Sequence, residues 1–356
     1  MESLTKNRQS REIVQKIAEK FFPDDRMAEY EELTEGYFNV AYEITLLSGR
    51  SVILKVAPPD EVPVMSYEKN IMFAETESMK MAAANPDIPV PLVYGYDDSR
   101  SICPSPYFLM EKLRGNSLYS IRENLPEENI NAIKKETGEV NRRINEIICP
   151  RFGLPGQQEC QGEEWFPVFR RMMEMGIEDA EARAVDLKVS AGEILECLEK
   201  DRRFFEEVKT PCLVHWDIWA GNIFTDGICV TGIIDWERSL WGDPLLEVGF
   251  RTFDVDICFR KGYGKERLTE SEERRALWYD VYMAVLQALE CEYRHYDTME
   301  MYERGVRLLG EQMKRMRLLQ GQQDRSAVDY PARLKGCRSP ESLQVRLLYR
   351  YRIRWY

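Results

Sequence analysis

The spacing of hydrophobic positions changes along the chain from a mixed pattern to an almost wholly helical one. Residues 10–22 place Ile13, Val14, Ile17 and Phe21 on one face of a helix. Short runs rich in β-branched and aromatic residues follow, and turn residues such as Ser48-Gly49 separate them. We predict strands at about 27–34, 40–47, 51–56, 92–96 and 107–111, the first three forming an antiparallel meander.

From about residue 117 onward, apolar residues recur mainly at helical spacing. We predict helices at about 117–124, 127–147, 163–175, 177–206, 271–294 and 298–320, in addition to an earlier one at 67–84. A small antiparallel sheet followed by many helices indicates the α+β class. We expect an N-terminal lobe at 1–111, a helical C-terminal lobe at 112–325 and a basic tail at 326–356.

One stretch, from Val214 to Glu247, combines a hairpin signal with polar residues. Two apolar runs are separated by Thr225-Asp226-Gly227, and an Asp-Gly turn between apolar runs is typical of a β-hairpin. A hairpin brings its two ends together, so Asp217, Asn222 and Asp235 are expected to converge. Two carboxylates and an amide offer the hard oxygen ligands that magnesium prefers. Beyond the hairpin, Asp243 before Pro244 is typical of a helix N-cap.

A second polar pair stands on apolar elements earlier in the chain. Lys55 lies inside the strand predicted at 51–56, and Glu75 shares a helix face with Ile71 and Met79. We expect the two side chains to pair, with Glu77 as the alternative partner. The other interpretation is that both charges simply face solvent.

Composition narrows the class of protein. The chain has 356 residues and a net charge of −12, which argues against nucleic-acid binding. No apolar run approaches a membrane span of about 18 residues, and the N-terminus lacks the apolar core of a signal peptide. Nine scattered cysteines without a CxxC pair suggest reduced thiols and a cytoplasmic protein. Only two histidines are present, so a His-rich metal site is excluded.

In these features the chain resembles the aminoglycoside phosphotransferase and choline kinase-like family, relatives of the protein kinases. The resemblance runs over roughly residues 30–320. It comprises the Gly36 turn, Lys55, Glu75, the hinge YFLMEKLRG, His215-x-Asp217-x4-Asn222, Ile-Ile-Asp235 and Gly242-Asp243-Pro244. The glycine turn is the poorest match, because the GxGxxG of protein kinases is absent.

The resemblance implies a bilobal kinase-like fold that binds ATP and Mg²⁺ between its lobes and transfers the γ-phosphate to a small-molecule hydroxyl. Asp217 would accept or orient the proton of that hydroxyl, while Asn222 and Asp235 would hold the metal. The expected nucleotide contacts are Lys55 paired with Glu75, the backbone of the Gly36 turn, and the hinge backbone at Glu111 and Leu113. His215 would hold the catalytic loop by hydrogen bonding.

The acceptor is less well defined by the sequence. Acidic residues are dense at 174–199 and 287–303, which suits a cationic, aminoglycoside-like or other amino-containing acceptor, although solvated helix faces explain them equally well. A choline- or sugar-type metabolite is the next candidate, and a nucleotide-binding pseudokinase is the alternative from another class. The tryptophans Trp216, Trp219, Trp236 and Trp241 would either stack on an acceptor or pack in the core.

Overall fold

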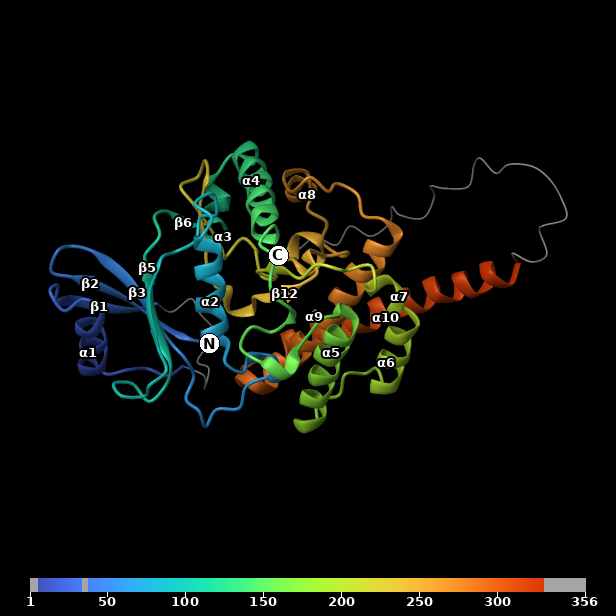
Figure 1. Ribbon diagram of the computed structural model, residues 1–356, viewed down its shortest axis with the longest axis horizontal. Coiled ribbons are helices and arrows are strands. Elements are labelled where there is room, and N and C mark those ends of the chain that lie inside the picture. The colour runs from blue at the N-terminus through green and yellow to red at the C-terminus, as the bar shows by residue number, and fades with distance from the viewer. Residues whose placement is uncertain (1–5, 34–37, 330–356) are drawn as a thin grey trace. The chain divides into compact units, whose positions relative to one another are not determined.

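A five-stranded antiparallel sheet forms the N-terminal part of the protein (Figure 1). The computed structural model describes residues 6–33 and 38–329. In sheet order the strands are β1 (Met27–Leu33), β2 (Val40–Leu46), β3 (Ser51–Val56), β5 (Tyr107–Glu111) and β4 (Val93–Asp97). Hydrophobic spacing therefore predicted all five strands, with ends that differ by a residue or so.

Two helices cover opposite faces of this sheet (Figure 1). Helix α1 (Arg11–Phe21), capped by the Ser10 side chain, packs Val14 and Ile17 against one face. Helix α2 (Ile71–Ala83) packs Met72 and Met79 against the other. Helix α2 begins later than predicted, because Asn70 takes a left-handed conformation with φ 56° that an α-helix cannot include.

The rest of the described chain is mainly helical, as predicted, and this confirms the α+β class. The longer helices are α4 (Glu127–Asn145), α5 (Trp165–Ala182), α6 (Ala191–Lys200), α9 (Glu270–Arg294) and α10 (Glu300–Asp329). Shorter ones are α3 (Leu118–Ile121), α7 (Arg202–Phe205) and α8 (Ile257–Tyr263). The 3₁₀ turns are η1 (Ser66–Glu68), η2 (Arg122–Asn124), η3 (Gln158–Cys160), η4 (Trp236–Arg238), η5 (Pro244–Leu246) and η6 (Val248–Phe250).

The break predicted between residues 175 and 177 is wrong, because helix α5 continues through Gly176 to Ala182. A side chain at Gly176 would place its Cβ 3.2 Å from Val285, so the glycine permits close packing on α9 rather than ending the helix. The actual break lies at 183–190, where Ala184 and Lys188 have positive φ and Ser190 caps α6.

Two small sheets contain the strands of the Val214–Glu247 segment. Strands β10 (Ile223–Thr225) and β11 (Val230–Ile233) form the predicted hairpin around Gly227, whose φ of 92° suits glycine, and β6 (Asn116–Ser117) joins them. The other sheet contains β8 (Gln161–Gly162), β7 (Phe152–Gly153), β12 (Leu240–Gly242) and β9 (Cys212–Val214). Strand β9 leads directly into the loop that carries His215 and Asp217.

The chain divides into two compact units, residues 1–313 and 314–356. The lobe boundaries expected near residues 111 and 325 remain predictions. Most of the basic tail lies outside the described residues. No helix in the described ranges combines the length and apolar character needed to cross a membrane.

Candidate active site

Lys55 stands between two carboxylates. Its ammonium donates to Oε1 of Glu75 at 2.7 Å and to Oδ1 of Asp235 at 2.9 Å. Strand β3 supplies the lysine, α2 supplies Glu75, and Asp235 follows β11. The attraction of Asp235 and Glu75 outweighs burial, which alone would lower the pKa of Lys55, and the pKa is raised. Glu77, the alternative partner, instead pairs with Lys80 at 2.8 Å.

Asp235 is held in an unusual conformation and belongs to a group of carboxylates. Its φ of 66° is left-handed, a geometry that costs free energy in a residue other than glycine and is common at functional sites. Carboxylate oxygens of Glu75, Asp235 and Glu237 lie within 4.8 Å of one another. Burial and the charge of Asp235 raise the pKa of Glu237 to about 8. Glu237 therefore holds its proton more strongly than an exposed glutamate does.

The segment after β9 forms a compact loop around Asp217. His215 is fully buried, its Nδ1 accepting from the Asp217 N–H at 3.2 Å and its Nε2 lying 3.0 Å from the Ile234 carbonyl oxygen. These contacts require a neutral ring protonated at Nε2, in agreement with the pKa of His215, which burial lowers. Asn222 donates its amide to the Asp217 carbonyl at 2.9 Å. The ring of His215 thus holds the loop in place.

A residue that sequence reasoning missed, Glu247, fixes the same loop from beneath. Its two carboxylate oxygens accept the N–H groups of Trp216 at 2.9 Å and Ile218 at 2.8 Å, on either side of Asp217. Trp216 has φ 70°, a strained value for a bulky residue, and the clamp maintains it. The available sequence signal was an acidic residue within the apolar run Leu245–Phe250, where a charge requires partners.

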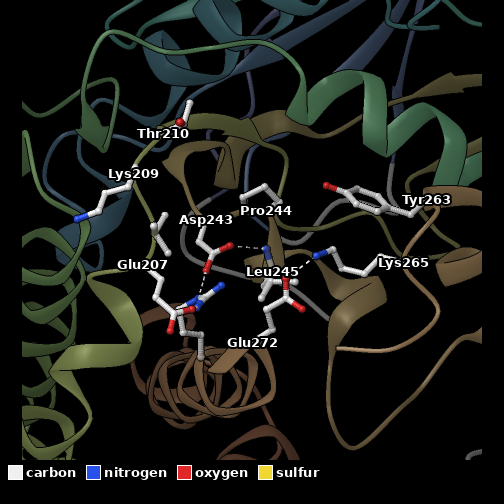
Figure 2. Close-up of a pocket in the computed structure, with 11 residues that line it drawn as sticks. Glu207, Lys209, Thr210, Asp243, Pro244, Leu245, Tyr263, Lys265 and Glu272 are labelled. Atoms are coloured by element: carbon white, nitrogen blue, oxygen red, sulfur yellow. Dashed lines mark hydrogen bonds and ion pairs between the residues drawn. The ribbon is translucent and has the colours of Figure 1, made fainter. Parts of the chain in front are cut away.

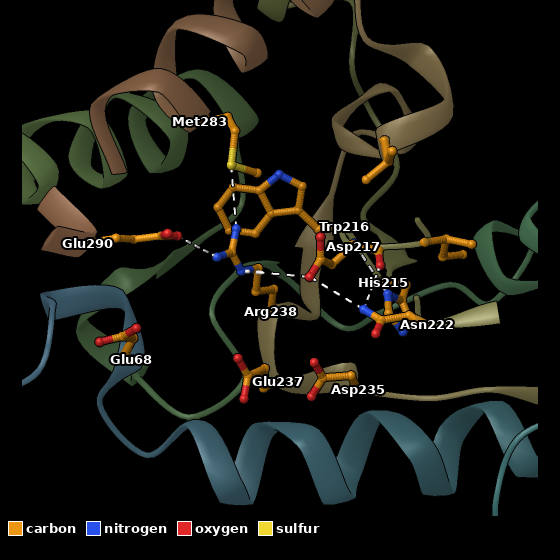
Figure 3. A network of polar contacts seen from close by, with 12 residues as sticks. Glu68, His215, Trp216, Asp217, Asn222, Asp235, Glu237, Arg238, Met283 and Glu290 are labelled. Carbon is orange, nitrogen blue, oxygen red and sulfur yellow. Dashed lines mark hydrogen bonds and ion pairs between the residues drawn. The ribbon is translucent and has the colours of Figure 1, made fainter. Parts of the chain in front are cut away.

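Arg238 links Asp217 to helix α9 (Figure 3). Its Nε lies 4.0 Å from Oδ2 of Asp217, and its Nη2 donates to Oε1 of Glu290 at 2.9 Å. Burial raises the pKa of Asp217, and the charge of Arg238 opposes that rise. Figure 3 shows Asp217, Asn222, Asp235 and Glu237 gathered in one region, so the structure brings together the three polar residues expected to converge.

Residues 34–37, which include Gly36, lie outside the described residues. The last two residues of the turn, Phe38 and Asn39, are described, and each contacts a charged side chain. Asn39 donates its side-chain amide to Glu237 at 3.0 Å. The guanidinium of Arg294 lies 4.8 Å from the ring centre of Phe38 and also pairs with Glu68 at 2.7 Å. The end of this turn is therefore tied both to the carboxylate group and to α9.

The two hinge residues, Glu111 and Leu113, make different contacts in the structure. The N–H of Glu111 donates to the Leu92 carbonyl at 2.8 Å, so an adenine contact at Glu111 would have to use its carbonyl oxygen. The side chain of Leu113 packs directly on Gly232 of β11. A Cβ added at Gly232 would lie only 2.1 Å from it. The hinge thereby contacts the β10–β11 hairpin, which begins directly after Asn222.

Arginine pairs with several residues of the acidic stretches. Glu174 and Glu199 both pair with Arg170, and Glu178 pairs with Arg171. Glu290 is buried, but its charge is matched by Arg238. These four carboxylates therefore have cationic partners within the protein.

A cavity of about 340 Å³ lies away from these residues, between η5 and the start of α9 (Figure 2). Asp243 lines it and accepts from Leu245 N–H at 3.1 Å and from Arg275 Nε at 2.6 Å, which confirms its capping role. Lys265 pairs with Glu272 across the same cavity. Its lining includes none of Lys55, Asp217, Asn222 or Asp235, so we assign it no part in the chemistry.

Comparison with known proteins identifies the family of the chain. Residues 29–279 match the model of the phosphotransferase enzyme family. A subtelomeric hrmA-associated cluster protein of Aspergillus fumigatus is 29% identical over 122 residues, which cover 34% of this chain and 23% of the relative. The match therefore spans less than a quarter of that relative's length.

Two solved structures share the fold. A thermostable mutant of aminoglycoside phosphotransferase APH(4)-Ia, in complex with ADP and hygromycin B, has a TM-score of 0.61 at 19% identity and covers 85% of this chain and 98% of its own. The streptomycin–ATP complex of APH(2")-IIa has a TM-score of 0.56 at 19% identity and covers 85% and 97%. The family match covers well over half of the sequence, and the chain therefore belongs to the phosphotransferase enzyme family.

Proposed function

We propose that the protein transfers the γ-phosphate of ATP to a hydroxyl group of a small molecule. The observation that carries this proposal is the junction of Lys55, Glu75 and Asp235 beside the loop of Asp217 and Asn222. Phosphoryl transfer depends on positioning and charge neutralisation more than on covalent catalysis by the protein. A buried lysine between two carboxylates, next to a clamped carboxylate and amide, supplies both.

On this proposal the nucleotide lies between the sheet and the helical part. Lys55 contacts its phosphates while Glu75 fixes the direction of the ammonium. The carbonyl of Glu111 and the backbone of Leu113 receive the adenine, and the Gly36 turn covers the phosphates. The ADP and ATP in the complexes of the two structural neighbours support ATP as the donor.

The residues present fit a magnesium ion. The carboxylates of Asp235 and Glu237 and the amide of Asn222 provide oxygen donors, which suit Mg²⁺. Burial and the charge of Asp235 raise the pKa of Glu237 to about 8, so a further negative charge here is unfavourable without a cation, and a divalent ion would supply that cation. We assign Asn222 and Asp235 as the ligands, with Glu237 beside them, and Mg²⁺ would neutralise charge on the phosphates when bound.

Asp217 is the proposed base. Its contacts with Asn222 and Arg238 fall on Oδ2, which leaves Oδ1 to receive the acceptor hydroxyl. The hydroxyl proton moves to Asp217 as the acceptor oxygen bonds to the γ-phosphorus and the bond from that phosphorus to the bridging oxygen of ADP breaks. The Glu247 clamp keeps this carboxylate from shifting.

An aminoglycoside-like or other amino-containing molecule is the first candidate acceptor, because the two neighbours bind hygromycin B and streptomycin. A choline- or sugar-type metabolite is the second, since arginine pairs with several of the acidic residues expected to attract a cation. The complete set of Lys55, Asp217, Asn222 and Asp235 argues against a pseudokinase. The eight described cysteines are free thiols, which supports a cytoplasmic location.

The test is a phosphotransfer screen with radiolabelled ATP and Mg²⁺. The panel contains hygromycin B, streptomycin, a macrolide, choline, ethanolamine, glucose and benzyl alcohol. We expect label to appear on at least one acceptor with wild-type protein and not with Asp217→Asn. Tight binding of MgATP without transfer to any acceptor, in a panel extended to further alcohols, would instead favour a nucleotide-binding protein.

A further inference from the structure

The four tryptophans of the Val214–Glu247 segment occupy different environments. Trp216 is 1% exposed and stacks on Tyr282, with ring centres 5.5 Å apart, and Trp236 is fully buried against His215. Trp241 is half-buried in β12. Trp219, in contrast, exposes 42% of its surface. Core packing therefore explains Trp216 and Trp236 but leaves the exposed face of Trp219 to be explained.

Trp219, Tyr119 and Arg122 form a row of neighbouring side chains. Its ring centre lies 5.6 Å from that of Tyr119, which is itself 51% exposed. The guanidinium of Arg122 lies 4.4 Å from the centre of the Tyr119 ring on the same short segment, a favourable cation–π contact. Two large aromatic side chains from separate elements thus meet at the surface, where exposure to water is unfavourable for their apolar faces.

The backbone fixes this row relative to Asp217. The N–H of Trp219 donates to the carbonyl of Asp217, and the N–H of Tyr119 donates to the carbonyl of Ala220, both at 2.9 Å. A Cβ at Gly221 would lie 2.3 Å from the Trp219 ring, so glycine is needed there for the indole to lie against the chain. Two residues span at most about 7 Å, so the backbone of Trp219 lies within that distance of Asp217, which puts the ring within the reach of a ring-sized acceptor.

We propose that Trp219 and Tyr119 form the acceptor platform of this enzyme, and that its acceptor carries a ring whose flat, apolar face stacks on Trp219. The inference rests on the proposed function, because it takes Asp217 as the site of the reacting hydroxyl. A sugar ring and an aromatic ring share this stacking chemistry. Arg122 acts through Tyr119 by holding its ring in place. An acyclic alcohol would leave the platform uncovered.

The experiment compares Trp219→Ala, Trp219→Phe and Tyr119→Ala with the wild type, using the acceptor found in the phosphotransfer screen. Ile228→Ala is the matched control, because Ile228 is 68% exposed on the neighbouring hairpin but lies outside the row. We expect Trp219→Ala to raise the acceptor KM about tenfold, equivalent to ~1.4 kcal/mol. The KM for ATP and the kcat should stay within about twofold. Trp219→Phe should recover most of the loss, and Tyr119→Ala should show a smaller rise.

Three results would overturn the platform: an acyclic preferred acceptor such as choline, an unchanged acceptor KM in Trp219→Ala, or a loss confined to ATP affinity. The glucose and benzyl alcohol arms separate a sugar ring from an aromatic one. A fluorescence titration with hygromycin B and benzyl alcohol adds a readout that needs no turnover. A ring compound should change the emission of wild type but not of Trp219→Phe. If the wild type transfers phosphate to none of the acceptors, the proposed function fails. The titration still tests the platform, because the same emission change in wild type and Trp219→Phe would overturn it.

Discussion

Lys55 and Glu75 lie twenty residues apart in the sequence but meet at 2.7 Å inside the protein. Glu75 is fully buried, so its charge depends on that one lysine and on few other groups. Burial raises the pKa of Glu75, and Lys55 partly offsets the rise. We therefore expect the contact to matter for folding as well as for the proposed nucleotide binding.

Lys55→Met should accordingly cost stability. The substitution leaves Glu75 and Asp235 without their shared cation, and breaking a buried ion pair from one side costs about 3–5 kcal/mol. Adding Glu75→Gln should recover part of that loss, because it removes one of the stranded charges. Urea unfolding of the single and double variants measures both effects. Equal stability of Lys55→Met and wild type would show that other groups neutralise Glu75.

Asp217→Asn tests the base. The amide cannot take the proton of the acceptor hydroxyl, and we expect turnover to fall by about 10²–10⁴-fold. Nucleotide affinity should change little, because the contacts of Lys55 remain. Asp254→Asn, at an exposed position, is the control. Turnover near the wild-type value in Asp217→Asn would remove Asp217 from the proposed role.

The clamp beneath the same loop gives a third prediction. In Glu247→Gln an NH₂ group replaces one of the oxygens that accept from Trp216 and Ile218, leaving one buried N–H unsatisfied. Such a loss costs about 1–3 kcal/mol. We expect lower stability together with a reduced kcat, since the loop is no longer fixed around Asp217. A variant that loses stability but retains full kcat would show that the clamp does not position the carboxylate.

Metal dependence is best tested at Asp235. Asparagine tolerates left-handed backbone, so Asp235→Asn should keep the fold while weakening the metal site. We expect Mg²⁺ to raise the affinity for ATP in wild type and to have little effect in the variant, as calorimetry with and without EDTA would show. Glu77→Gln, on α2 but paired with Lys80, is the control. An unchanged magnesium effect in Asp235→Asn would rule out this assignment.

Sequence patterns predicted the parts of the site that depend on local spacing. A β-branched run and a helical pattern placed Lys55 and Glu75 on a strand and a helix, and the Asp-Gly turn placed Asn222 at the start of the hairpin. The environments of Trp216 and Trp219 could not be read in this way, because adjacent tryptophans of equal hydrophobicity differ only in their tertiary neighbours. Glu247 and Arg238 were missed for a similar reason, since their partners come from elements distant in sequence. The helix break predicted at Gly176 was wrong because glycine has two roles that sequence does not distinguish. It can end a helix, or it can permit close packing within one, as it does here.

Asp97 offers a prediction on pH far from the site. Its Oδ2 accepts from Lys20 at 2.6 Å and from Tyr107 at 2.5 Å, and its Oδ1 accepts from Ser99 N–H at 2.8 Å. Burial alone would raise the pKa of Asp97, but these hydrogen bonds lower it below the ordinary value. A depressed pKa in the folded protein means that stability is gained above the unfolded pKa of about 3.9 and lost as pH falls through the folded value.

Asp97→Asn should therefore destabilise the protein by about 1.5–3 kcal/mol at pH 7, the usual contribution of a hydrogen bond to a charged group. The difference from wild type should stay constant down to about pH 5 and shrink below pH 4, because protonation removes the advantage of the carboxylate. Urea unfolding at pH 7, 5, 4 and 3.5 measures it. Asp60→Asn, whose side chain is 68% exposed, should differ little from wild type at any of these values. A difference for Asp97→Asn that is the same at pH 7 and 3.5 would mean that the neutral hydrogen bonds, rather than the charge, stabilise this end of the sheet.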